Sequence, residues 1–102
     1  MKPLSTTVTA LALLAAAGIA HAADPDLGRN LAATCATCHG TNGQAVQGAG
    51  MEALAGMDKA KALQKLSEFR SGAKPASIMH QISKGFTDEQ LDLMAAFFAA
   101  QK

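Results

Sequence analysis

The stretch Cys35-Ala36-Thr37-Cys38-His39 decides how the rest of this chain is interpreted. It places two thiols three positions apart and an imidazole directly after the second thiol. On a helix, residues three positions apart are neighbours on the surface, so both thiols can reach one ligand. The stretch therefore brings three chemically reactive side chains to one short segment.

The spacing C-x-x-C-H is the attachment pattern of c-type haem. Each thiol can form a thioether to one vinyl group of a single porphyrin, and the adjacent imidazole is presented to the iron. We therefore predict one covalently bound haem c, with Cys35 and Cys38 as thioether donors and His39 as the proximal iron ligand.

Three other roles for the cysteines account for less of the sequence than haem attachment does. A disulfide between Cys35 and Cys38 gives no role to His39. A thioredoxin-like redox pair requires strands alternating with helices, and no run of alternating β-branched residues is present. A zinc ion would draw on the cysteines with His39 or His80, and no complete ligand set is apparent.

The second axial position of the iron has several candidate ligands, which are Met51, Met57, Met79, His80 and Met94. Met94 falls on the apolar row of an expected helix, where packing accounts for it. Met79 is expected in a loop that also contains Pro75 and Gly85, and a loop can cover the far face of the haem. We therefore predict Met79 as the distal iron ligand, with His80 as the alternative.

The sequence predicts three amphipathic helices, and together they indicate an all-α fold. The first two precede the C-terminal region. The first is expected to start at Asp24-Pro25, as N-cap and first helical position, and to run through Cys38. The second is expected to begin at Asp58 and to end at Gly72.

The third expected helix is the best marked. Thr87 and Gln90 form a capping box at its start, and Lys102 closes its other end. Its apolar row consists of Leu91, Met94, Ala95 and Phe98. The glycine-rich stretch 40–50 between the first and second helices is expected to be a loop.

Residues 1–22 are predicted to be a signal peptide that is removed on export to the periplasm. Lys2 supplies a positive charge, residues 10–20 form an uncharged apolar run, and Ala20-His21-Ala22 provides a small-x-small cleavage site. The run is shorter than the roughly 20 apolar residues of a membrane-spanning helix. We therefore expect a haem domain at 23–102 with no membrane span in the mature chain.

The expected domain has little material for a core. It contains four Phe, no Trp and no Tyr, and a chain of this size buries a small share of its surface without help. A large apolar cofactor such as haem would supply what is missing. Without Lys2 its eight basic and eight acidic residues balance, and no basic patch interleaved with aromatics indicates nucleic acid as a partner.

The chain resembles class I cytochromes c over Asp24 to Lys102. The resemblance is carried by residues 30–40 around the motif, Leu54-Ala55-Gly56, Phe69-Arg70-Ser71-Gly72, and Ser77-Ile78-Met79-His80 leading to 87–91. The chain is most similar to haem domains of periplasmic dihaem cytochromes and to the cytochrome subunit of flavocytochrome c sulfide dehydrogenase.

The resemblance implies a small class I cytochrome c fold with three main helices around one haem and with His39 and Met79 as iron ligands. It also implies that the first and last helices cross where Gly28 receives the ring of Phe97. Many members carry a proline shortly before the Leu-Ala-Gly turn, where a backbone carbonyl accepts the Nδ1 proton of the proximal histidine. This chain has Met51-Glu52-Ala53 there, so the acceptor is expected within 48–53.

His/Met ligation leaves no open coordination site, so the implied activity is one-electron transfer and not catalysis. A free shuttle between redox partner proteins is one form of this function. The alternative is an electron-accepting cytochrome subunit of a flavocytochrome c complex, similar to sulfide dehydrogenase, with a flavoprotein subunit as partner. A five-coordinate haem enzyme or gas sensor would require loss of the sixth ligand, and the sequence favours electron transfer over it.

Overall fold

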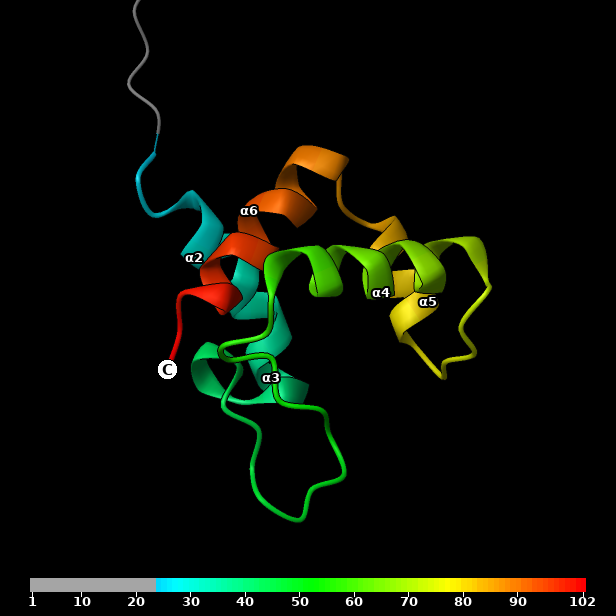
Figure 1. The fold of residues 1–102 in the computed structure, drawn as a ribbon, viewed down its shortest axis with the longest axis horizontal. Helices are drawn as coiled ribbons and strands as arrows, with labels where there is room; N and C mark the ends of the chain where they lie inside the picture. Colours follow the sequence, from blue (N-terminus) through cyan, green and yellow to red (C-terminus); the bar gives the residue numbers. More distant parts are fainter. Residues whose placement is uncertain (1–23) are drawn as a thin grey trace, which may run out of the picture.

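A computed structural model describes residues 24–102, and the expected signal peptide lies outside the described residues. Every regular element within 24–102 is helical, which confirms the all-α prediction (Figure 1). In chain order the elements are α2 (Leu27–Ala32), η1 (Ala33–Cys35), α3 (Ala36–His39), η2 (Thr41–Gly43), α4 (Lys59–Ser71), α5 (Met79–Lys84) and α6 (Asp88–Ala99). No helix in this described part is both long enough and apolar enough to cross a membrane.

The first helix starts later than predicted and is interrupted. The Asp24 carboxylate accepts a hydrogen bond from the backbone N–H of Asp26 at 2.9 Å, so Pro25 lies in an Asx-type turn and the helix begins only at Leu27. Further along, the Thr34 hydroxyl donates to the Leu31 carbonyl at 2.9 Å. Such back-bonding favours distortion of a helix, and here the chain narrows into the 3₁₀ turn η1 before α3.

The second helix, α4, begins and ends where its sequence signals predict. The Asp58 carboxylate caps it by accepting from the backbone N–H of Lys61 at 3.3 Å. Gly72 follows its last residue in the left-handed conformation with φ of 86°, which glycine adopts without steric cost. The half-buried Leu63 and Leu66 of this helix pack against the core.

Helix α5 occupies the segment that was expected to be a loop, and this part of the prediction was wrong. Met79 is the first residue of this six-residue helix. The buried Ser83 donates its hydroxyl to the Met79 carbonyl at 2.7 Å, and α5 packs against α4 (Figure 1). The helix is too short for its hydrophobic period to be recognised between Pro75 and Gly85.

Helix α6 supplies most of the core. Its capping box is present, because Thr87 and Gln90 each donate a backbone N–H to the other's side chain. The predicted apolar row of Leu91, Met94, Ala95 and Phe98 is buried. Three of its residues form one cluster with Ala32 of α2, namely Leu91, Met94 and Phe98.

Helices α2 and α6 cross closely at Gly28, which confirms its packing role. A Cβ atom on Gly28 would lie 2.9 Å from the backbone carbonyl oxygen of Leu93. The nearest atoms belong to Leu93, whereas the resemblance implied Phe97 as the residue received there. The ring of Phe97 makes an edge contact with that of Phe98, with centroids 5.4 Å apart.

The glycine-rich stretch forms a loop as predicted, apart from the single 3₁₀ turn η2 at its start. This loop extends away from the helices in Figure 1. It returns at Leu54 and Ala55, whose backbone N–H groups donate to the Gly43 carbonyl at 2.8 and 3.0 Å. Next, the N–H of Gly56 donates to the Phe98 carbonyl at 2.8 Å and joins the turn to α6.

Candidate haem-binding site

Two hollows that share lining residues lie among the motif, α4, α5 and the 51–57 segment, and together we call them the cavity. The smaller, inner part has a volume of about 100 Å³ and the larger, outer part about 570 Å³, and the outer volume is typical of a small-molecule or cofactor site. Four residues line both parts, namely Cys35, His39, Phe69 and Met79. The inner wall is mostly apolar and includes Leu54, Leu66, Met94 and Phe98.

Both cysteines of the motif are free thiols on the wall of the outer part. Cys35 is half-buried and Cys38 is exposed. Burial raises the pKa of the Cys35 thiol above its ordinary value. The short helix α3 ends at His39, so the imidazole follows Cys38 on the same turn and faces the same cavity.

The imidazole of His39 is held by the backbone. Its Nδ1 lies 2.6 Å from the carbonyl oxygen of Glu52, and because a carbonyl can only accept, Nδ1 carries the proton. The other ring nitrogen, Nε2, is then the one with a lone pair for a metal, and the hydrogen bond fixes the ring orientation. The acceptor lies within the expected 48–53 segment, and the structure identifies it as Glu52.

The side chain of Glu52 is itself anchored. The ammonium group of Lys65 in α4 donates to the Glu52 carboxylate and forms an ion pair with it. This hydrogen bond holds the pKa of the Glu52 carboxyl below its ordinary value. Lys65 and Glu52 both line the inner part of the cavity, so the pair forms part of its wall.

Met79 is the methionine that lines both parts of the cavity. Met51 lines only the outer part, and Met57 and Met94 line only the inner part. His80, the alternative ligand, lines neither part, and its Nδ1 is buried without a hydrogen-bond partner. The structure thus brings all four predicted site residues together and leaves His80 outside.

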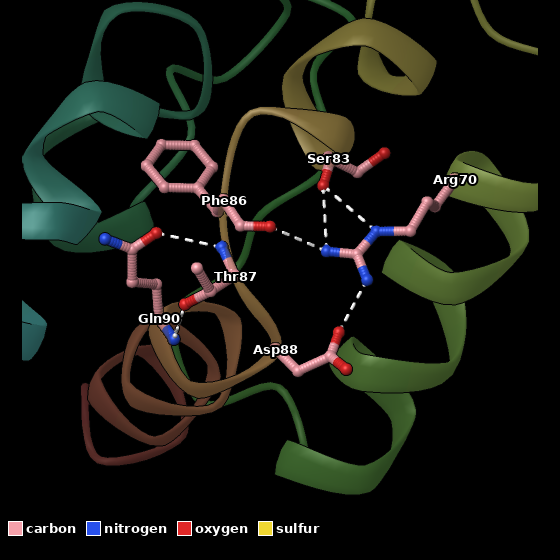
Figure 2. Close-up of polar contacts among 6 residues, drawn as sticks. All are labelled: Arg70, Ser83, Phe86, Thr87, Asp88 and Gln90. Atoms are coloured by element: carbon pink, nitrogen blue, oxygen red, sulfur yellow. Dashed lines mark hydrogen bonds and ion pairs between the residues drawn. The ribbon is translucent and has the colours of Figure 1, made fainter.

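Arg70 at the end of α4 positions the element that carries Met79, a role for which no specific signal is visible in the sequence. Figure 2 shows its guanidinium between α5 and α6. It donates to the carbonyl of Phe86 at 2.8 Å, to that of Ser83 at 3.3 Å, and to the carboxylate of Asp88 at 2.5 Å. These bonds tie the turn between α5 and α6 to α4.

The residues present fit a haem c. Two thiols, an imidazole with Nε2 as its metal-binding nitrogen and a thioether converge on one cavity with largely apolar walls. Thiolate-derived thioethers and His/Met axial ligation are the donor set of c-type cytochromes.

The sequence matches the family model of cytochrome c over residues 25–102. The chain is 37% identical over 106 residues to the thiosulfate dehydrogenase electron acceptor of Stutzerimonas stutzeri, an alignment that covers 98% of this chain and 49% of that protein. It is 32% identical to cytochrome c4 of Azotobacter vinelandii, with 93% of this chain and 50% of that protein covered. With the cytochrome subunit of sulfide dehydrogenase of Chlorobaculum tepidum the identity is 30%, and the alignment covers 70% of this chain and 63% of that subunit.

The chain therefore belongs to the cytochrome c family, and membership implies covalently bound haem c. The resemblance stated from the sequence is confirmed, both to dihaem cytochromes, of which cytochrome c4 is one, and to the cytochrome subunit of sulfide dehydrogenase. The chain spans about half the length of the first two of these relatives.

Proposed function

We propose that this protein is a one-electron carrier with a single haem c. Cys35 and Cys38 hold the haem through thioether bonds, and His39 and Met79 are its axial ligands. The observation that carries this proposal is that Met79 and the three motif residues line one cavity. When bound, the haem supplies an iron that gains and loses one electron.

The chain's own residues prepare this chemistry. The Glu52 carbonyl orients the His39 ring and increases its basicity as a ligand. Helix α5 presents the Met79 thioether from another wall of the cavity. His39 and Met79 would both ligate the iron and would leave no coordination site for a substrate, so the proposed role is electron transfer and not catalysis.

The walls of the inner part are mostly apolar, and the outer part opens at the surface beside Met51 and Ile78. These two side chains are 48% and 55% exposed. We expect redox partner proteins to exchange electrons at this opening. Export follows from the sequence features of residues 1–22, and the proposed working location of the mature domain 23–102 is the periplasm.

The alternative proposal is an electron-accepting subunit of a dehydrogenase complex with a flavoprotein subunit. The similarity to the cytochrome subunit of sulfide dehydrogenase favours it. Purification from the native host distinguishes the two forms. A shuttle purifies as a single chain, whereas a subunit copurifies with a flavin-bearing chain.

The direct test of the proposed ligands is an optical spectrum of the protein expressed with periplasmic haem attachment. We expect a low-spin c-type spectrum and a weak sulfur-to-iron band at the red end in the oxidised protein. The band should disappear in Met79→Ala and persist in Met51→Ala and Met57→Ala, whose side chains also line the cavity.

Protein mass measures haem number and leader removal in the same samples. We expect one haem per chain and an N-terminus at Ala23. A wild-type protein without haem contradicts the proposal as a whole. A band that survives in Met79→Ala but not in Met57→Ala makes Met57 the ligand instead.

A further inference from the structure

The segment that supplies the hydrogen-bond acceptor for His39 has little backbone restraint of its own. Gly48 and Gly50 have φ of 84° and 76° and no neighbouring atoms within 4 Å of a Cβ position. No proline occurs between Pro25 and Pro75, so no ring fixes a φ angle there. In the described structure, residues 45–53 make one backbone–backbone hydrogen bond, which is local and runs from the Ala49 N–H to the Val46 carbonyl.

Glu52 anchors this segment at two points. Its carbonyl accepts from Nδ1 of His39 at 2.6 Å, and its carboxylate pairs with the Lys65 ammonium. Among the described residues, the hydrogen bonds and ion pairs of positions 50–53 are made by Glu52 alone. The carbonyl and carboxylate belong to one residue, so a side chain held at Lys65 restricts where the carbonyl can lie.

Lys65 is a firm attachment point. It lies in the middle of the thirteen-residue helix α4, and its side chain is only 22% exposed, against 48% for Glu52. The apolar stem of the lysine therefore packs along the cavity wall while its ammonium group reaches the carboxylate.

We propose that the Glu52–Lys65 ion pair positions the proximal ligand by holding the Glu52 carbonyl on Nδ1 of His39. The inference rests on the proposed function, since it takes His39 as an iron ligand. The hydrogen bond to a ligating histidine sets its orientation and basicity, and through them the reduction potential. Glu52 and Lys65 are thus positioning residues, which act through the His39 ring.

The test measures exchange of the His39 Nδ1 proton with water by NMR in the reduced, haem-loaded protein. In Lys65→Gln and in Glu52→Gln we expect this exchange to be about two- to fivefold faster than in the wild type, the range expected for loss of a partly exposed ion pair. The doubly exchanged variant Glu52→Lys with Lys65→Glu restores an ion pair and should return the rate toward the wild-type value.

Lys59→Gln is the matched control. Lys59 is on the same helix and pairs with Asp92 at 2.9 Å, with exposed fractions of 43% and 50%, and it lines neither part of the cavity. The substitution makes the same charge change without touching Glu52, so the exchange rate should not change.

The reduction potential separates positioning from simple charge effects. Removing a cation and removing an anion near the haem shift its potential in opposite directions by field alone. A charge effect alone would therefore shift the potential in opposite directions in the two single variants. Faster proton exchange in both of them is instead the signature of lost positioning. A rate unchanged in both, with His39 and Met79 ligation intact in the spectrum, overturns this inference and leaves the proposed function standing. A wild-type protein without a c-type spectrum overturns both.

Discussion

Gly43 is buried where the turn η2 meets the Leu54 turn and helix α6. Its φ is 78°, and its carbonyl accepts hydrogen bonds from the N–H groups of Leu54 and Ala55. A Cβ atom on Gly43 would lie 2.8 Å from both the Ala55 nitrogen and a ring carbon of Phe98. This residue therefore needs both the backbone freedom and the small volume of glycine.

We expect Gly43→Ala to lower the free energy of unfolding of the haem-loaded protein by about 3 kcal/mol. Backbone strain at positive φ and overpacking each contribute of the order of 1–3 kcal/mol. Gly48→Ala is the control, because its φ of 84° is similar but no atom lies within 4 Å of the added methyl group. Its cost should be about 1–2 kcal/mol. Denaturant unfolding of both variants measures the difference, and equal costs would contradict the packing argument.

The helices differ in how well their existence and bounds could be predicted from the sequence. The bounds of α4 and the start of α6 follow from Asp58, Gly72 and the Thr87 capping box, because these signals are local in sequence and act on the adjacent backbone. The end of α6 was predicted wrongly, because the helix ends at Ala99 and Lys102 lies beyond it. Helix α5 lacks a side-chain cap and is held by contacts with α4 that are distant in sequence. The motif residues could be predicted because their chemistry depends on spacing alone. The Glu52 carbonyl and Arg70 could not, because their roles arise only from the folded arrangement.

Arg70 is expected to stabilise α5 and, through it, the bond between Met79 and iron. Arg70→Met keeps an apolar stem but removes every donor to the carbonyls of Ser83 and Phe86. Leaving such part-buried carbonyls without partners costs about 1–3 kcal/mol, so we expect a loss of about 2–3 kcal/mol in unfolding free energy. Added imidazole should also displace Met79 at lower concentration, which the loss of the sulfur-to-iron band measures.

Asp88→Asn is the control for that experiment. It removes the ion pair on the exposed side of Arg70, where the Asp88 side chain is 84% exposed, and such pairs contribute about 0–1 kcal/mol. It also removes a carboxylate charge from the first turn of α6, which contributes at most about 1 kcal/mol at an exposed site. An Arg70→Met protein with wild-type stability and imidazole affinity would show that α5 is held by its packing on α4 alone.

At the scale of the whole molecule, the helices between residues 24 and 102 pack on one another around a small core and also line a cavity. The fully buried apolar residues of this part are two alanines, a leucine, a methionine and a phenylalanine. Leu54, Leu66 and Phe69 are only half-buried, and all three line the inner part of the cavity. Much of the apolar surface that would complete the core therefore faces the proposed haem.

We expect the haem-free chain to lack a stable tertiary fold. Burial of a large apolar macrocycle against these walls contributes several kcal/mol at about 25 cal/mol per Å², which is comparable to the roughly 5–15 kcal/mol stability of a whole small domain. Residues 23–102, expressed in a cytosol without haem attachment, should have weaker helical circular dichroism than the haem-loaded protein and no cooperative thermal transition at micromolar concentration. A sharp transition with the same helix content would show instead that the α2, α4 and α6 contacts suffice, and that haem adds function to a fold already formed.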